Sequence, residues 1–383
     1  MKLEDAKRQI ERHRELHAFI SISDETGGGP VVAVKDLVDV RGTVTTAGGI
    51  ILPKTPAAED APVVRRLRGH GCVVVGKTNL HEFAYGVTSV NPHYGAVLNP
   101  HDPSRVAGGS SGGSAVAVAT GMCDWAIGSD TGGSISIPSG LCGVVGFKPA
   151  VGSIDTTGVI PLSRSLDTLG PMAPDVATAA EAFAMMTGEA APSMPDSRPR
   201  FGVPANWVRD LDDQTSLAWA LVSKGIPEIQ FVEHGPLFRD GLTILMVEAS
   251  VYHRRWVAEF PDSYGADVLT LLRRGFEILA VDYEAARTAR PGLQAAARAA
   301  MSDIDALILP TTAIVAPPVT AGTEAREPLA RYTRPFNLTG QPVVSLPAPV
   351  KGLPVGIQVV GRDNAGALAA AMWLEREWRS LAA

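Results

Sequence analysis

Three glycine-rich segments place a serine, lysine or threonine beside flexible backbone, and each could carry a different chemistry. The segment 71–78 (GCVVVGKT) matches the phosphate-binding loop pattern G-x-x-x-x-G-K-[ST]. The segment 108–112 (GGSSG) contains G-x-S-x-G, the nucleophile elbow pattern of α/β-hydrolases. The segment 128–134 (GSDTGGS) places Ser134 after two glycines whose N–H groups could converge on an anion. The surroundings of each segment decide between these chemistries.

The context of 71–78 argues against nucleotide binding. A phosphate loop needs a strand before its first glycine and a helix after its lysine. Here a helical pattern precedes Gly71, and the four interior residues are one cysteine and three valines. Valine is stiff and favours strands, whose N–H groups cannot curl around a phosphate. We therefore predict a core strand with Lys77 at its end, and nucleotide binding is the alternative.

The two serine segments differ in what precedes them. A nucleophile elbow follows a strand, but 99–107 contains two prolines and no strand pattern. The elbow also needs a downstream histidine, and His234 and His253 lie on segments without turn signals. In 128–134, by contrast, a short predicted strand leads into a Gly-Gly turn that could hold a tetrahedral oxyanion. A structural turn without chemistry is the alternative for that segment taken alone.

Taken together, these segments resemble the amidase signature family. The resemblance runs from about residue 30 to 360 and is weakest over 190–300. It rests on ordered motifs at 33–36 (AVKD), 76–84 (GKTNLHEFA), 91–92 and 99–100 (both NP), 108–114 (GGSSGGS), 130–134 (DTGGS), 143–149 (GVVGFKP), 165–172 (SLDTLGPM), 337–342 (NLTGQP) and 353–358 (LPVGIQ).

The resemblance implies a Ser–Ser–Lys triad. Ser134 would be the nucleophile, Lys35 the general base, and Ser110 the bridging serine, preceded by a cis peptide bond after Gly109. The oxyanion hole would consist of backbone N–H groups from Thr131, Gly132, Gly133 and Ser134. The activity implied is an amidase that transfers an acyl group from a small amide to water, without metal or cofactor.

Elementary chemistry supports the same roles. A serine hydroxyl is a weak nucleophile until a base takes its proton. Lysine can be that base only when neutral, so burial must lower its pKa. Lys35 follows four apolar residues of a predicted strand, which is a buried setting. A bridging hydroxyl can accept one hydrogen bond and donate another, so Ser110 could relay protons without a histidine.

The sequence departs from the family pattern beside the nucleophile. Ser136 stands where relatives often have arginine, which puts a carboxylated substrate in doubt but leaves the triad intact. We take Ser136 and Tyr85 as candidate substrate-binding residues. Asp130 and Asp167 are interpreted as structural braces of the turn rather than as acids.

Strand and helix patterns alternate, which predicts an α/β fold with a mixed, mostly parallel sheet covered by helices on both faces. We expect one amidase domain over 1–383, with an internal linker near 190–199. Strand-like runs occur at 31–34, 72–75, 125–128, 144–147, 201–203, 229–232, 306–309 and 343–346. Helical patterns fill 3–19, 62–68, 111–122, 175–187, 212–224, 241–258, 265–274, 278–300 and 365–382.

The composition of the chain limits the classes of partner that it could bind. The net charge is −6, from 34 basic and 40 acidic residues without charge blocks, which argues against nucleic acid. No apolar stretch reaches 18 residues and the start is charged, so we expect no membrane span or secretory signal. Three cysteines fit reduced thiols in a cytoplasmic protein. The predicted partners are a small amide and water, with a homodimer left open.

Two other functions stay open at the level of sequence. The chain could be an amidotransferase-type subunit that needs a partner protein. It could also hydrolyse a urea or carbamate, because the same acylation would serve those substrates.

Overall fold

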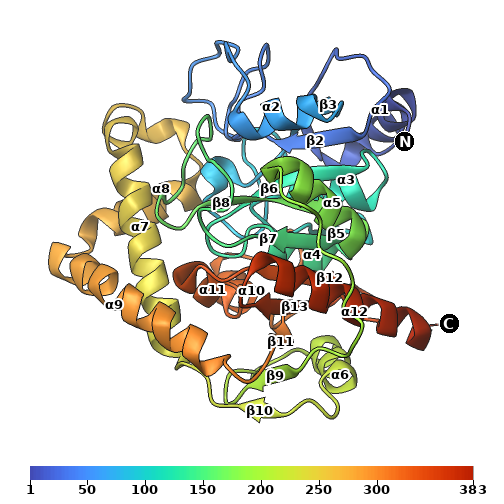
Figure 1. Cartoon of the computed structure of the whole chain (residues 1–383). Helices are drawn as coiled ribbons and strands as arrows, with labels where there is room; N and C mark the ends of the chain where they lie inside the picture. The colour runs from blue at the N-terminus through green and yellow to red at the C-terminus, as the bar shows by residue number, and fades with distance from the viewer. Residues whose placement is uncertain (383) are drawn as a thin grey trace.

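Apolar runs form the strands of one large sheet in the computed structural model, which describes residues 1–382 (Figure 1). Within these residues, eleven strands pair in the order β1-β3-β2-β6-β8-β7-β12-β13-β11-β9-β10. The sheet runs from β3 and β2 at the top of Figure 1 to β9 and β10 at the bottom. Its strands are β1 (Phe19–Ile22), β2 (Val31–Lys35), β3 (Val73–Thr78), β6 (Trp125–Asp130), β7 (Val145–Lys148), β8 (Thr168–Ala173), β9 (Phe201–Pro204), β10 (Glu228–Ile229), β11 (Ala306–Pro310), β12 (Val343–Pro347) and β13 (Gly356–Gly361).

The sheet is mixed, as the α/β prediction required. Parallel pairs join β3, β2 and β6 in one half, and β11, β9 and β10 in the other. All other pairs of this sheet in the described residues are antiparallel and outnumber the parallel ones, which corrects the expectation of a mostly parallel sheet. One cause is β8, which lies antiparallel between β6 and β7. Its sequence contains Gly170 and Pro171, which hide the strand pattern.

Helices cover both faces of the sheet. Successive strand residues point to opposite faces, and where both sets are apolar each face needs a covering layer. In β2, Val32 and Val34 join one apolar cluster and Val31 and Ala33 join another. The first cluster includes residues of α2 (Pro62–Gly69), α5 (Val176–Thr187) and α12 (Asn364–Ala382). The second includes residues of α1 (Leu3–Arg12) and α3 (Gly112–Ala119).

A further group of helices gathers on the left of Figure 1. Helix α7 (His234–Glu259) packs against α8 (Ala266–Glu277), α9 (Ala280–Ala300) and α11 (Arg334–Thr339). The remaining helices are α4 (Ser136–Cys142), α6 (Asp213–Val222) and α10 (Arg326–Ala330).

Several boundaries differ from the sequence predictions. The first helix ends at Arg12 rather than at 19, and 19–22 is the edge strand β1. A strand, β5 (Asp102–Val106), does precede 108–112, but it pairs with β4 (Leu98–Asn99) in a separate two-stranded hairpin. The elbow geometry of an α/β-hydrolase, which uses a strand of the main sheet, is therefore still not present.

One other prediction agrees with the structure. The segment 71–78 follows α2 and forms the buried strand β3, as predicted. The segment 190–199 contains neither helix nor strand, and its role as an internal linker stays a prediction. No helix among residues 1–382 combines the length and the apolar character that crossing a membrane would need.

Candidate active site

Lys35 occupies the last position of β2, where an entirely buried strand carries it into the interior. Its Nζ donates hydrogen bonds to three hydroxyls: Ser110 Oγ at 2.7 Å, Ser111 Oγ at 2.9 Å and Ser129 Oγ at 2.9 Å. Within residues 1–382 this amine forms no ion pair. A buried amine surrounded by hydroxyls can exchange a proton with any of them.

Burial shifts the protonation of this lysine. Desolvation lowers the pKa of Lys35 from 10.5 to about 7, although the carboxylates of Asp130 and Asp167 oppose the shift. A group with a pKa near the working pH is suited to general base catalysis, because a large fraction of it is neutral. The requirement set by the sequence, a lysine that burial makes less basic, is met by this geometry.

Ser110 is held rigidly at its backbone. The peptide bond between Gly109 and Ser110 is cis. The Ser110 carbonyl accepts hydrogen bonds from the His81 N–H (3.1 Å) and the Ser89 hydroxyl (3.2 Å). A Cβ on Gly109 would lie 2.8 Å from the Ser89 backbone nitrogen, so only glycine fits there. These contacts direct the Ser110 hydroxyl toward Lys35.

Ser134 lies in the turn after β6 and is almost buried, with 6% of its surface exposed. Its carbonyl accepts the Ser111 N–H at 3.2 Å, which fixes it next to the Ser110 segment. Its hydroxyl forms no hydrogen bond to Lys35 or Ser110 among the described contacts. The structure therefore joins Lys35 and Ser110 directly and brings Ser134 beside them through the backbone.

The turn before Ser134 is organised by one carboxylate. Asp130 accepts the N–H of Gly133 at 2.8 Å and of Ile135 at 2.6 Å. Gly133 has φ +118, and a Cβ there would lie 2.1 Å from Thr333 Oγ1, so the position requires glycine. The Gly133 N–H is thus already occupied. Of the four predicted oxyanion donors, three have no hydrogen-bond partner among residues 1–382, namely the N–H groups of Thr131, Gly132 and Ser134.

The two aspartates act as braces, in agreement with the sequence interpretation. Asp130 also accepts from Asn337 Nδ2 at 2.8 Å. Asp167 accepts from Thr131 Oγ1 at 2.6 Å and from the backbone N–H groups of Leu162 and Ser163. Burial raises the pKa of Asp167 to about 6. Both carboxylates therefore accept hydrogen bonds that tie the turn around Thr131–Ile135 to neighbouring segments.

A cavity of about 390 Å³ opens onto Ser134 and Gly132. The predicted substrate residue Tyr85 lies on its wall. Ser136 does not line it; this residue is buried at the start of α4, with its N–H 3.4 Å from Asp130. The apolar part of the wall is formed by Val87, Leu162, Phe238, Leu242, Leu245, Met246 and Leu271.

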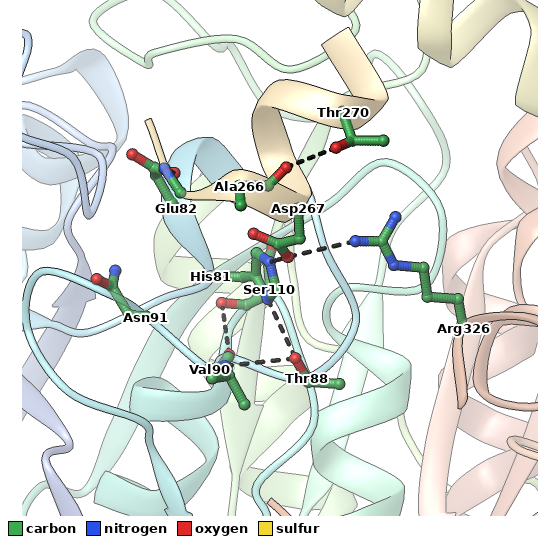
Figure 2. A network of polar contacts seen from close by, with 12 residues as sticks. His81, Glu82, Thr88, Val90, Asn91, Ser110, Ala266, Asp267, Thr270 and Arg326 are labelled. Atoms are coloured by element: carbon green, nitrogen blue, oxygen red, sulfur yellow. Dashed lines mark hydrogen bonds and ion pairs between the residues drawn. The ribbon is translucent and has the colours of Figure 1, made fainter. Parts of the chain in front are cut away.

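A polar network links the Ser110 segment to helix α8 at one side of this cavity (Figure 2). His81, whose N–H binds the Ser110 carbonyl, lies 2.9 Å from Asp267 and 3.3 Å from the Thr88 hydroxyl through its ring nitrogens. Arg326 reaches the same Asp267 oxygen at 3.3 Å. Burial opposes ionisation of Asp267, but His81 and Arg326 outweigh it and lower its pKa to about 2.

Sequence reasoning missed several of these residues. Ser111 and Ser129 flank predicted residues but carried no signal of their own. Arg334, which also lines the cavity, and the residues that contact His81 come from segments remote in sequence. For Ser129 the available signal was its place in the strand that leads into 130–134.

The comparisons with known proteins concern the chain as a whole. Its site combines a buried lysine bound to a serine after a cis peptide bond with a second serine in a glycine turn, on a mixed α/β sheet. The Amidase family model matches residues 11–215 and 239–367. The chain belongs to the amidase family and is an amidase-class enzyme.

Particular relatives cover nearly the whole chain. A glutamyl-tRNA(Gln) amidotransferase subunit from Methanospirillum hungatei is 33% identical over 91% of this chain and 93% of its own length. AtzE, which is a 1-carboxybiuret hydrolase subunit from Pseudomonas sp. (strain ADP), is 33% identical over 92% of this chain and 86% of its own. A crystal structure of an amidase superposes with a TM-score of 0.91 at 34% identity, covering 98% of this chain and 95% of the other.

Proposed function

We propose that the chain is a serine amidohydrolase that cleaves the C–N bond of a small amide through an acyl-enzyme on Ser134. The observation that carries this proposal is the hydrogen bond of 2.7 Å between Lys35 Nζ and Ser110 Oγ, made by a lysine whose pKa falls to about 7. It supplies a base and a relay beside a serine that opens onto a cavity.

In the first half-reaction the Ser134 oxygen attacks the amide carbonyl carbon. Its proton passes to Ser110, and the Ser110 proton passes to neutral Lys35. The negative charge that develops on the carbonyl oxygen is stabilised by the unpartnered N–H groups of the 131–134 turn. The C–N bond then breaks, and the proton returns from Lys35 through Ser110 to the leaving nitrogen.

In the second half-reaction water attacks the ester carbon of the acyl-enzyme. The relay takes a proton from the water and returns one to the Ser134 oxygen as the C–O bond breaks. The products are a carboxylic acid and an amine or ammonia, and the enzyme is restored. Apart from the substrate and water, these steps use only groups of the chain.

A second candidate is an amidotransferase-type subunit. It is favoured by the near full-length match to a protein named as a subunit of a glutamyl-tRNA(Gln) amidotransferase. Urea or carbamate hydrolysis is a variant of the first proposal, since the same acyl transfer applies. A panel of amides, ureas and carbamates with the purified chain alone separates them, because a partner-dependent subunit would hydrolyse none.

Active-site labelling tests the nucleophile. A fluorophosphonate probe followed by peptide mass spectrometry should place the adduct on Ser134, because such probes react with activated serines. Ser134→Ala should abolish labelling. The matched control is Ser136→Ala, two residues away and outside the cavity, which should still be labelled. An adduct on another serine in active protein would overturn the assignment.

A further inference from the structure

Arg334, the first residue of α11, lines the active-site cavity without an anionic partner. Its Nε is buried and has no hydrogen-bond acceptor, and its guanidinium forms no ion pair among the described residues. The guanidinium lies instead over the ring of Phe238, 4.5 Å from its centroid. A desolvated cation normally needs hydrogen bonds and a counter-charge, so this one lacks a partner of matching chemistry.

The other charged groups on the same wall are paired, except Arg274, which is exposed and forms no ion pair among the described residues. Arg326 contacts Asp267 at 3.3 Å. Glu327 binds Arg331, with a distance of 2.7 Å between Nη2 and Oε2. Neither carboxylate reaches Arg334. Burial lowers the pKa of Arg334 to about 10, which still leaves it charged at neutral pH. Among the described residues, Arg334 is therefore the cavity cation that combines a buried, unpartnered nitrogen with the absence of an ion pair.

This cation lies next to the oxyanion turn. A Cβ built on Gly132 would be 3.6 Å from Arg334 Nε. The preceding residue, Thr333, donates its hydroxyl to the Gly132 carbonyl at 3.0 Å, which fixes the start of α11 against the turn. Both Gly132 and Ser134 line the same cavity as Arg334. An anionic group bound here would lie close to the scissile carbonyl.

Tyr85 provides a second donor on the same wall. Its hydroxyl is buried and has no hydrogen-bond partner. Burial raises the pKa of Tyr85, and the positive charge of Arg334 opposes that rise, which indicates that the two groups lie close enough to interact electrostatically. A phenol O–H and a guanidinium, both unsatisfied, are a matched pair of donors for the two oxygens of a carboxylate.

We propose that Arg334 and Tyr85 bind a carboxylate of the substrate, so that the enzyme prefers amide acids, in which a short spacer separates a carboxylate from the scissile amide. This inference rests on the proposed hydrolase function and specifies its substrate class. The serine at position 136 placed a carboxylated substrate in doubt; Arg334 supplies the missing positive charge from a different element.

Binding to an inactive enzyme tests the site without turnover. Malonamate, succinamate and glutaramate are titrated calorimetrically into Ser134→Ala protein, with butyramide as the neutral comparator. At least one amide acid should bind more tightly than butyramide. Adding Arg334→Gln should weaken that binding by roughly 10- to 100-fold, as expected for a charge-assisted hydrogen bond. Adding Tyr85→Phe should weaken it by roughly 3- to 10-fold.

The matched control is Arg326→Gln, which removes the same charge from the same wall but from a cation already paired with Asp267. It should change amide-acid binding by no more than about threefold. Equal losses of amide-acid binding in the two arginine variants would overturn the inference. The losses would then come from the overall positive potential of the cavity and not from a contact with Arg334. Tighter binding of butyramide than of all three amide acids would overturn it as well. Tyr85→Phe keeps the test decisive if Arg334→Gln does not fold.

Turnover separates this inference from the proposed function. In active protein, Arg334→Gln should lower the ratio of kcat/KM for the preferred amide acid over butyramide by roughly 10- to 100-fold. An unchanged ratio with active enzyme would reject the carboxylate site and leave the hydrolase proposal standing. Binding of amide acids that depends on Arg334, without hydrolysis of any amide, would support the carboxylate site and reject the hydrolase proposal.

Discussion

Two buried lysines on neighbouring strands meet opposite environments. Lys35 ends β2 and Lys77 lies in β3, where Val34 pairs with Lys77 in the parallel ladder. Lys77 forms an ion pair of 2.7 Å with Asp36, and both side chains are almost fully buried. Lys35 has only hydroxyl partners. The chain thus places a paired cation and an unpaired amine side by side.

The difference shows what makes a buried lysine available as a base. A carboxylate in contact favours the charged form of a lysine, whereas burial with neutral partners disfavours it. The carboxylate of Asp36 is directed to Lys77 although it follows Lys35 in the chain, because the backbone turns after β2. The motif-like Lys77 is therefore structural, and the less conspicuous Lys35 is the one suited to chemistry.

The largest expected effect comes from removing the amine of Lys35. Lys35→Met keeps most of the volume and should lower kcat/KM by roughly 10³- to 10⁴-fold, the upper range for loss of a general base. The folded state should survive, because a buried amine with neutral partners is replaced by an apolar chain of similar length. Steady-state kinetics and circular dichroism check both parts. Turnover within tenfold of the parent would contradict the role proposed for Lys35.

Breaking the neighbouring Lys77–Asp36 ion pair should lower the stability of the fold. Asp36→Asn leaves the Lys77 charge buried without its carboxylate, so the free energy of unfolding should fall by roughly 3–5 kcal/mol. Urea denaturation measures this change. The double variant Asp36→Asn/Lys77→Met removes the stranded charge and should recover much of the loss. A single variant as stable as the parent would show that the pair does not differ from Lys35 in the way described.

The sequence predicts the elements around these lysines better than their partners. Strands β2, β3 and β6 each begin with at least three consecutive apolar residues, and the predicted ranges overlap the observed ones. Strand β8 and the hairpin strand β5 contain glycine or proline, which removes the local signal although tertiary pairing still forms strands. The helix predicted from 241 begins at His234. The prediction started too late because glycine and proline in the first turn weaken the helical pattern there.

In the site, too, local motifs predict individual residues, whereas tertiary contacts are not predicted. The motifs identify Lys35, Ser110 and Ser134, but the contacts of Ser111 and Ser129 with Lys35 depend on how β2, α3 and β6 meet. Arg334 belongs to a segment that contacts the 131–134 turn from far along the chain, since the Thr333–Gly132 hydrogen bond spans 201 positions. No periodicity or spacing encodes such a contact in one sequence.

The pH dependence of kcat/KM tests whether Lys35, unlike the ion-paired Lys77, has a lowered pKa. The folded pKa of about 7 lies below the ordinary 10.5, so the neutral, proton-accepting form is gained as pH rises through about 7. The value of kcat/KM should therefore increase tenfold per pH unit below about 7 and level off above it. A profile measured from pH 5 to pH 9 checks this. A plateau that begins only near the ordinary lysine pKa would mean that burial does not act as described.

The smallest effect should come from one hydroxyl of the Lys35 cluster. Ser129 Oγ accepts a hydrogen bond from Lys35 Nζ at 2.9 Å and so favours the charged amine. Ser129→Ala should lower the pKa of Lys35 further and move the acidic limb of the kcat/KM profile down by roughly half to one pH unit. The matched control is Ser114→Ala, whose hydroxyl contacts Thr78 at 2.7 Å and not Lys35. Its limb should not move, and an upward shift in Ser129→Ala would contradict the view that Ser129 stabilises the charged form of Lys35 by accepting its hydrogen bond.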